Sequence, residues 1–363
     1  MSTFLHSNMD QMIWVHLPLG YEKPGLACLL KKGLYGLKQS PRLWAHKVRQ
    51  KLAKYGYKPL QSDTSIYRHN KLKIYVITYV DDFLLIGPSQ EGITNLKFQL
   101  QSEFEMKDLG ECNYFLGIQI VRDRKNRQIH LSQSAYIDKV LATFQMEKAI
   151  SKSTPMELGI KKSIADYNGI VTKTETTTYQ SMIGSLMYAM TQSWPDLAYA
   201  VSFLSHFLQN PGPVHIKAAQ RVLRYLKQTK NIGITYDGKQ PGFYGYSDAD
   251  YGEDIQTRKS RNGYVFYLYG GPISWKSARQ KCVTLSSTES EYYGLSSAAR
   301  EAAWLRLLTE LKYQSGDIKP TIIKGDNQGS LLWPRTLSSI RGLSTLIFSI
   351  ITSAGGCKRL YSP

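Results

Sequence analysis

The sequence predicts an α+β fold divided into two or three domains. Its 363 residues allow that number at roughly 100–200 residues per domain. Residues 74–86 and 243–277 form strand-length runs rich in β-branched and aromatic residues. Residues 137–144 and 183–226 instead place apolar residues three and four positions apart, which is the period of an amphipathic helix. Separate β-rich and helix-rich segments are typical of this fold class.

The overall charge is strongly basic and favours a polyanionic partner. Lys and Arg number 46 against 28 acidic residues, a net charge of +18. Nucleic acid is the simplest such partner, and the alternative is a basic soluble protein without one. No run reaches the roughly 18 apolar residues of a membrane span, and the N-terminus does not have the pattern of a signal peptide. We therefore expect a cytoplasmic or nuclear protein with no membrane partner.

The four cysteines argue against a structural metal site. They lie at positions 28, 112, 282 and 357. This spacing is too wide for a zinc motif, so a reducing compartment is favoured.

Two apolar strands flank a pair of aspartates in the first third of the chain. Residues 74–80 and 83–86 have strand composition, and Asp81 and Asp82 separate them. Two polar residues between two strands predict a tight hairpin with both carboxylates at its tip. Aspartate is also an ordinary turn residue, so the pair alone leaves both a structural and a catalytic role open.

A loop that contains glycine and lysine lies upstream, at residues 31–44. Gly33 and Gly36 allow the backbone to approach a ligand closely. Its cationic residues, which suit phosphate groups, are Lys31, Lys32, Lys38 and Arg42. The composition predicts a loop that leads into a helix, and it leaves phosphate binding open.

Helical segments occupy the middle of the chain. One apolar helical face is formed by Ile137, Val140, Leu141 and Phe144. Residues 154–178 lack such a period and predict a linker, whereas residues 179–229 are helical, with Pro213 at a helix start. Four basic residues lie along the last helix: Arg221, Arg224, Lys227 and Lys230. We favour a solvated face for them over contact with nucleic acid.

Acidic residues recur at strand ends and at a helix start in the C-terminal third. A strand leads into Asp248 and Asp250, two further strands follow, and a helix is expected over residues 286–311. Glu291 lies near the start of this helix, and Asp326 follows a short strand. Three strands, a helix, a strand and a helix, with acids at these points, resemble the ribonuclease H arrangement.

Each of these acids also has a purely structural explanation. Thr288 and Glu291 have the spacing of a capping box, in which the glutamate bonds a backbone amide at the helix start. Asp326 can cap the next helix, and Asp250 can serve in a turn.

Three segments together resemble the polymerase of copia-type LTR-retrotransposon Pol polyproteins. They are LYGLKQSPRLW at residues 34–44, YVDD at residues 79–82, and FEMKDLGECNYFLGIQI at residues 104–120. The second resembles the Tyr-x-Asp-Asp box of reverse transcriptases, and residues 113–120 are similar to the hairpin that grips the primer end. YSDAD, SSTESEY and GDNQ are similar to the nuclease of the same family. The resemblance covers nearly all of residues 1–332.

The resemblance implies a truncated polymerase followed by a nuclease. Residues 1–120 would be the reverse transcriptase palm, and residues 121–165 a thumb-like segment. A helical connection, residues 166–238, and a ribonuclease H-like domain with a mixed sheet and helices, residues 239–332, would follow. The family's activities are RNA-directed DNA synthesis and cleavage of the RNA strand of RNA–DNA hybrids. A host nuclease of ribonuclease H type alone would leave YVDD and LYGLKQSPRLW unexplained.

The resemblance also implies site residues, cofactors and partners. The polymerase metals would be held by Asp81 and Asp82, and the nuclease metals by Asp248, Glu291 and Asp326. Glu289 is a less favoured substitute for Glu291. The incoming nucleotide would lie near Gly36, Lys38 and Gln39. Each site would use two Mg²⁺ ions, which are hard cations that prefer carboxylate oxygens. The expected partners are an RNA template, a DNA primer, RNA–DNA hybrid and deoxynucleotides, and the oligomeric state stays open.

A count of the acids predicts that this copy is catalytically defective. The family's third polymerase aspartate lies before a segment that resembles residues 3–6, so it falls outside a chain that begins at Met1, and Asp10 lies too late to replace it. The resemblance also stops after Leu332. A reading frame shifted by one nucleotide would restore a family-like sequence with the last nuclease aspartate, so we expect residues 333–363 to be an out-of-frame tail. The alternative is a non-enzymatic, basic nucleic-acid-binding remnant of a decayed element.

Overall fold

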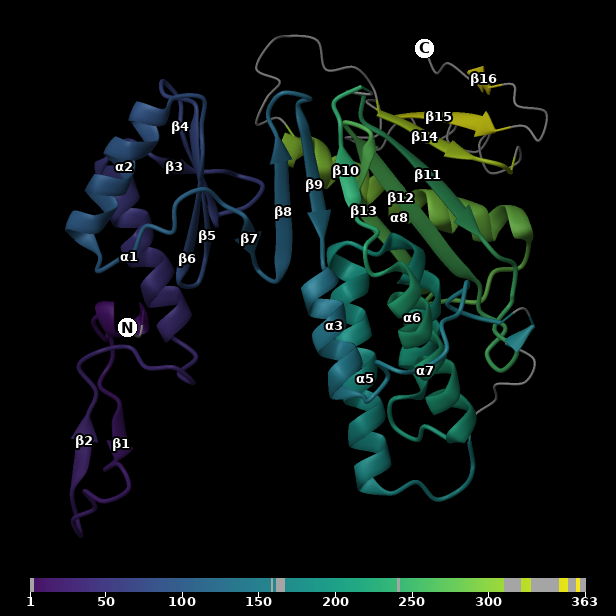
Figure 1. The fold of residues 1–363 in the computed structure, drawn as a ribbon, viewed down its shortest axis with the longest axis horizontal. Coiled ribbons are helices and arrows are strands. Elements are labelled where there is room, and N and C mark those ends of the chain that lie inside the picture. Colours follow the sequence, from purple (N-terminus) through teal and green to yellow (C-terminus); the bar gives the residue numbers. More distant parts are fainter. Residues whose placement is uncertain are drawn as a thin grey trace. The chain divides into compact units, whose positions relative to one another are not determined.

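The structure, a computed structural model, describes residues 3–157, 159–160, 167–239, 242–309, 321–327, 346–351 and 357–359. The chain divides into two compact units, Met1–Cys112 and Asn113–Pro363, each with its own sheets and helices (Figure 1). Largely antiparallel sheets and separate helical segments confirm the predicted α+β fold.

The first unit contains a sheet that two helices cover on one face. The sheet is antiparallel, with the strand order β3–β4–β5–β6. Its elements are β3 (Lys58–Pro59), β4 (Ile66–His69), β5 (Ile74–Tyr79), β6 (Asp82–Ile86), α1 (Ser40–Lys54) and α2 (Gln90–Glu103). They are preceded by a short helix, η1 (Thr3–His6), and a two-stranded ribbon of β1 (Trp14–His16) and β2 (Ala27–Leu29).

Local sequence explains where these two helices begin and which face they bury. Pro41 occupies the first turn of α1, where the missing amide hydrogen costs nothing. Trp44, Val48 and Leu52 then recur every four residues and form its buried face. α2 begins after Ser89, whose hydroxyl accepts a hydrogen bond from the helix backbone at 3.1 Å. The buried faces enclose the core that supports β5, the strand that leads to the two aspartates.

The second unit begins with a four-stranded sheet in the order β10–β9–β8–β7. Its strands are β7 (Tyr114–Phe115), β8 (Ile118–Asp123), β9 (Gln128–Ser132) and β10 (Ile234–Tyr236). We expected residues 113–120 to belong to the palm. They lie in the second unit instead, because β7 pairs with β8 and β8 pairs with β9, and neither pairs with the sheet of the first unit.

A helical bundle belongs to the same unit. Its elements are α3 (Ser134–Thr143), α5 (Lys173–Gln192), η2 (Pro195–Leu197), α6 (Ala198–Leu204), η3 (Ser205–Phe207) and α7 (Pro213–Thr229). The helices lie side by side around one apolar core (Figure 1). α7 starts at Pro213 as predicted. α5 starts earlier than the expected residue 179, because Thr172 and Glu175 form a capping box, so the predicted linker is shorter.

The four basic residues singled out from the sequence, three on α7 and Lys230 directly after it, are bound to other parts of the chain. The pairs are Arg221 with Glu157, Arg224 with the carbonyl of Ile150, Lys227 with the carbonyl of Ala149, and Lys230 with Asp138. All four side chains are half-exposed, so the face stays partly solvated, and its contact with nucleic acid stays untested. The four cations also hold preceding segments of the chain against this helix.

A six-stranded sheet and one long helix complete the unit. The strand order is β13–β12–β11–β14–β15–β16. The elements are β11 (Tyr244–Ala249), β12 (Arg261–Leu268), β13 (Gly271–Arg279), α8 (Ser287–Thr309), β14 (Thr321–Gly325), β15 (Leu346–Ile351) and β16 (Cys357–Arg359). β11 pairs antiparallel with β12 and parallel with β14. α8 packs Leu295 and Ala298 onto Phe266 and Ile323 of the sheet.

The C-terminal tail contributes to this sheet. We expected residues 333–363 to be an out-of-frame tail, and one segment of it, β15, pairs in parallel with the whole of β14. An apolar, β-prone segment can pair with an open strand edge whatever its origin. β16, also in the tail, pairs antiparallel with β15, and residues 333–345, 352–356 and 360–363 lie outside the described residues.

Candidate metal centre and carboxylate hairpin

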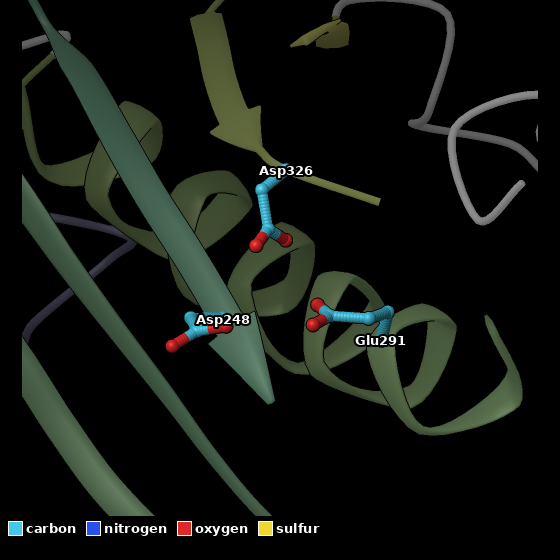
Figure 2. Close-up of side chains that lie close together, drawn as sticks. All are labelled: Asp248, Glu291 and Asp326. Carbon is cyan, nitrogen blue, oxygen red and sulfur yellow. The ribbon is translucent and has the colours of Figure 1, made fainter. Parts of the chain in front are cut away.

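Three carboxylates converge at one end of the six-stranded sheet (Figure 2). One oxygen from each of Asp248, Glu291 and Asp326 lies within 4.8 Å of the other two. Among the residues that the structure describes, no other group of three His, Cys, Asp or Glu side chains is placed in this way. The fold therefore brings together the three acids that the sequence singled out for the nuclease metals, and their binding of metal stays a prediction.

Parallel strand pairing explains why two of these acids meet. β11 and β14 are neighbours with Tyr246 opposite Lys324. Asp248 and Asp326 each lie two residues further along, so they share a face at the same end of the sheet. Glu291 reaches them from the beginning of α8, and its Oε1 accepts a hydrogen bond from Ala249 N at 3.3 Å.

Hydrogen bonds at the start of α8 separate the roles of the two glutamates. Ser286 Oγ accepts a hydrogen bond from Glu289 N at 3.1 Å, and Glu289 Oε2 accepts one from Leu285 N at 2.7 Å. Glu289 therefore belongs to the helix cap. The capping box that we considered between Thr288 and Glu291 is wrong, because the helix begins earlier. The carboxylate of Glu291 lies instead beside the two aspartates.

Glu291 lies in an environment that disfavours its negative charge. The residue is only 6% exposed. Burial, and then the nearby charges of Asp248 and Asp326, raise the pKa of Glu291 to about 7. Three like charges in so small a space repel one another, and a cation between them would remove that repulsion.

The donor set suits a hard divalent cation. Mg²⁺ prefers oxygen ligands and is commonly held by a few carboxylates together with water or phosphate. Asp248 and Asp326 are exposed, whereas Glu291 is buried, so a cation here would be open to solvent on one side. The three side chains therefore fit Mg²⁺ both in ligand chemistry and in charge.

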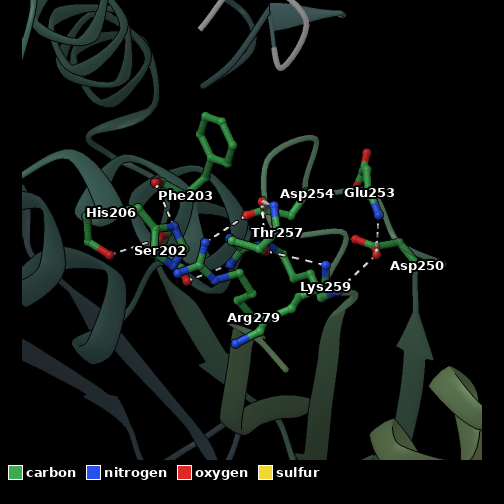
Figure 3. Close-up of polar contacts among 11 residues, drawn as sticks. Ser202, Phe203, His206, Asp250, Glu253, Asp254, Thr257, Lys259 and Arg279 are labelled. Carbon is green, nitrogen blue, oxygen red and sulfur yellow. Dashed lines mark hydrogen bonds and ion pairs between the residues drawn. The ribbon is translucent and has the colours of Figure 1, made fainter. Parts of the chain in front are cut away.

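The loop after β11 is fixed by polar contacts next to this centre (Figure 3). Arg279 donates to Asp254 Oδ2 at 2.8 Å, and Thr257 donates to Asp254 Oδ1 from its backbone and hydroxyl at 2.8 and 2.9 Å. Burial opposes the charge of Asp254, but these bonds prevail and lower its pKa to about 2. Asp250 Oδ1 accepts a bond from Arg261 N at 2.9 Å, so Asp250 shapes the turn.

The other pair of aspartates lies at a hairpin in the first unit. β5 and β6 pair with Tyr79 opposite Asp82, so the two-residue turn consists of Val80 and Asp81. The turn lies one residue earlier than we expected, and Asp82 begins β6. Val80 has a φ of 49°, a conformation that is costly for a β-branched residue. A positive φ at the first turn position matches the type II′ turn, which suits the twist of a hairpin.

Two aromatic side chains hold this turn in place. Tyr35 Oη donates to the carboxylate of Asp81 at 3.0 and 3.2 Å. The buried Trp44 donates from Nε1 to the carbonyl of Val80 at 2.7 Å. Residues 31–44 therefore pack directly against the hairpin. Sequence reasoning missed both roles, although both aromatic donors lie within the motif LYGLKQSPRLW.

The expected nucleotide-binding residues lie in the same segment. Gly36 has a φ of +91°, which favours glycine, and it is exposed. Lys38 is also exposed, and Gln39 directly precedes α1. These residues border the loop that contacts Asp81 through Tyr35.

The hairpin offers fewer acids than the metal centre. In the described parts of the chain, no third His, Cys, Asp or Glu joins Asp81 and Asp82 in a compact group. Asp10 is paired with Arg42, whose hydrogen bond lowers the pKa of Asp10. Asp10 therefore forms an ion pair with α1 and does not join the two aspartates of the hairpin.

The segment similar to the primer-gripping hairpin does form a hairpin. β7 and β8 are joined by Leu116 and Gly117, whose φ values of 48° and 73° match a type I′ turn. Tyr188 of α5 donates to the carbonyl of Leu116, which ties the turn to the bundle. Its contact with a primer stays a prediction.

The chain is similar to known proteins along most of its length. A family model described as reverse transcriptase (RNA-dependent DNA polymerase) matches residues 1–158. A transposon Ty5-1 protein of Saccharomyces cerevisiae is 35% identical over 307 residues, which are 83% of this chain and 98% of the yeast protein. The chain belongs to the copia-type retrotransposon Pol family.

Larger copia-type Pol proteins extend well beyond this chain. The retrovirus-related Pol polyproteins from transposon TNT 1-94 of Nicotiana tabacum and from transposon RE1 of Arabidopsis thaliana are each 39% identical, over 344 and 338 residues. Each alignment covers 91% of this chain but only 25% and 22% of the respective polyprotein. Because less than a tenth of this chain is left out, both carboxylate sites lie within the aligned region.

No described helix of this copia-type Pol chain combines the length and apolar composition that a membrane crossing requires.

Proposed function

We propose that the chain is the reverse transcriptase and ribonuclease H segment of a retrotransposon Pol protein. In this proposal the first unit contains the palm of the RNA-directed DNA polymerase, and residues 239–332 form the module that acts on RNA–DNA hybrids. The observation that carries it is the group of Asp248, Glu291 and Asp326, whose oxygens lie within 4.8 Å of one another. The net charge of +18 suits a nucleic-acid substrate.

The chemistry of the centre follows from its charges. When bound, paired Mg²⁺ ions stabilise the attacking and leaving oxygens of an in-line phosphoryl displacement. Asp248 and Asp326 are exposed and would face the nucleic acid, whereas the buried Glu291 would hold the inner side of the ion. Because the pKa of Glu291 is about 7, this carboxyl would release a proton as the cation binds at neutral pH.

The hairpin would take the corresponding place in the polymerase. Asp81 and Asp82 would hold its metals, and Gly36, Lys38 and Gln39 would lie near the incoming deoxynucleotide. In the described part of the chain only two acids are gathered there, against three at the other centre. Fewer carboxylates neutralise less cation charge, so we propose that this copy binds template and primer without extending them efficiently.

A second candidate is a non-enzymatic nucleic-acid binder. It is favoured by the same shortage of acids at the hairpin and by the engagement of Asp10 with Arg42. This candidate predicts binding that weakens steeply with salt, because each released counterion contributes to affinity, but no effect of Mg²⁺ at Asp248.

Two assays on the purified full chain separate these possibilities. The first follows the thermal midpoint with and without Mg²⁺ for the wild type and Asp248→Asn. We expect Mg²⁺ to raise the midpoint of the wild type alone, and an equal response of both proteins would contradict the metal centre.

The second assay measures primer extension and hybrid cleavage. We expect no extension above background and cleavage close to background. Extension that disappears in Asp81→Asn, or cleavage that disappears in Asp248→Asn, would show that this copy is not defective in the respective activity.

A further inference from the structure

A buried amide lies directly behind the metal centre. Gln280, the residue after β13, is 2% exposed, and Ser290, the residue before Glu291, is 0% exposed. Burial of a polar side chain costs free energy unless the side chain is hydrogen-bonded. We therefore expect both of these side chains to form hydrogen bonds.

The two side chains bond to each other and to the end of β11. Gln280 Nε2 donates to the carbonyl oxygen of Ser290 at 3.0 Å and to Ser290 Oγ at 3.2 Å. Ser290 Oγ donates in turn to the carbonyl of Asp250 at 2.6 Å. Gln280 N donates to the carbonyl of Ser260 at 2.8 Å, which anchors the residue to the start of β12. One continuous set of bonds therefore joins β12, β13, α8 and β11.

This set of bonds ends next to two of the three candidate metal ligands. Asp250 lies two residues after Asp248, and Ser290 lies one residue before Glu291. The strand and the helix that carry these ligands are thus fixed to each other by a bond from the Ser290 side chain to the backbone of Asp250, within two residues of both ligands. The direct bond between Ala249 N and Glu291 is longer, at 3.3 Å. The loop that follows Asp250 is itself held by the polar contacts of Figure 3.

Stability alone does not account for a glutamine here. Gln280 Oε1 is buried, and within the described residues it has no hydrogen-bond partner. An unbonded buried acceptor costs free energy, and an apolar side chain of the same length would avoid that cost. What only the amide supplies is the pair of donated bonds that places Ser290.

We propose that Gln280 is a positioning residue of the metal centre, because its amide fixes Ser290 and thereby the position of Glu291 opposite Asp248. This inference rests on the proposed function, since it requires the centre to hold a divalent cation. Gln280 contacts neither the cation nor a substrate and acts only through Ser290.

The test compares cation binding in full-length variants. Gln280→Met keeps the length of the side chain and removes both donated bonds. Mutation of a residue that orients a metal ligand typically weakens metal affinity by about 10- to 100-fold. We therefore expect titration calorimetry to show that Gln280→Met binds Mn²⁺ at least about tenfold more weakly than the wild type. Amide hydrogen exchange at residues 287–291 of the metal-free protein should also become faster.

A neighbouring buried residue provides the matched control. Thr284 is 4% exposed, and its hydroxyl lies 3.2 Å from Ser260 Oγ without reaching Ser290. Thr284→Val should lower the thermal midpoint but leave Mn²⁺ affinity and the exchange of residues 287–291 unchanged. Equal losses of affinity in Thr284→Val and Gln280→Met would mean that Gln280 has only a general structural role, and the inference would fall.

Two further variants keep the outcome decisive. Should Gln280→Met not fold, Ser290→Ala interrupts the same set of bonds one step further along, because it removes the bonds of Ser290 Oγ to Gln280 and to Asp250 and keeps the bond to the Ser290 carbonyl. It should also weaken Mn²⁺ binding. Unchanged affinity in the folded variants overturns the inference, provided that the wild type binds Mn²⁺ and Asp248→Asn does not. If the wild type itself binds no Mn²⁺, the proposed function and this inference fall together.

Discussion

Replacement of Glu291 by glutamine should stabilise the metal-free protein and abolish its response to Mg²⁺. Glu291 is buried beside Asp248 and Asp326, and its pKa is raised to about 7 from an ordinary value of 4.5. Between those two pH values the folded chain holds a proton that the unfolded chain has lost. The contribution of this group to stability is therefore full below pH 4.5 and is lost as the pH rises through 7.

The size of the effect follows from the two pKa values. One unit of pKa difference corresponds to about 1.4 kcal/mol at 25 °C. At pH 8 the buried charge of Glu291 should therefore cost the folded state about 3 kcal/mol, a cost that Glu291→Gln removes. At pH 4.5 and below, where the carboxyl is protonated in both states, the two proteins should be nearly equal in stability.

Urea denaturation in the presence of a chelator, at pH 4.5 and pH 8, measures the difference directly. Glu289→Gln is the control, because it removes a carboxylate from the same helix start without touching the centre. We expect no stabilisation from it at pH 8. Adding Mg²⁺ at pH 8 should raise the stability of the wild type but not that of Glu291→Gln. Equal stability of wild type and Glu291→Gln at pH 8 without metal would refute the argument.

Three other substitutions test the geometry elsewhere. Val80→Gly removes a strained φ of 49° at a half-exposed turn, and chemical denaturation should show the first unit more stable by about 1 kcal/mol. Gly184 lies within α5 with nothing within 4 Å of an added Cβ, so Gly184→Ala should stabilise the second unit by about 1 kcal/mol in the same assay. Lys227→Ala should destabilise the second unit because the bond to Ala149 is lost, while fluorescence anisotropy between about 50 and 200 mM salt should show unchanged nucleic-acid affinity.

Each of these three predictions has a distinct contrary result. A less stable Val80→Gly would show that the turn is not strained by its φ. A less stable Gly184→Ala would mean that another part of the protein packs against α5 at Gly184, where the structure leaves open space. A weaker salt dependence of nucleic-acid binding in Lys227→Ala would restore α7 as a contact surface.

Local patterns were sufficient to predict the strands around Asp81, Asp248 and Asp326 and most of the long helices, whereas α2 was missed. The three acids of the candidate metal centre came from the family resemblance, because each of them also had a purely structural explanation. Asp248 and Asp326 each follow a run of strand-forming residues, so local composition alone predicts that each lies at the end of a strand. Their meeting requires β11 and β14 to be parallel neighbours, which the ribonuclease H-like order of elements implied.

The sequence-based predictions failed where the local structure depends on a residue far away in the sequence or on a choice between two neighbouring residues. The observed hairpin turn lies one residue before the predicted one, because the pairing of Tyr79 with Asp82 sets the register of the two strands. The capping glutamate is Glu289 because the helix starts at Ser287, a boundary that composition does not fix. The basic stripe of α7 found partners far earlier in the chain, and no local pattern reveals such contacts.

The C-terminal tail also forms a contact that the sequence did not predict. The apolar segment Leu346–Ile351 forms β15 because the edge of β14 offers unpaired backbone groups with which any β-prone segment can pair. Gln280 and Ser290 were also invisible in the sequence, because their importance depends on a contact between the end of one strand and the start of a helix.

The central claim is that Asp248, Glu291 and Asp326 form a divalent-metal centre. Crystals of the full chain soaked with Mn²⁺ at pH 8 test it directly, because anomalous scattering locates the ion independently of the protein coordinates. We predict an anomalous peak between the three carboxylates, at about 2.0–2.3 Å from at least one oxygen of each, and no such peak in Asp248→Asn crystals. Wild-type crystals that bind Mn²⁺ only elsewhere, or whose peak persists in Asp248→Asn, would contradict the account.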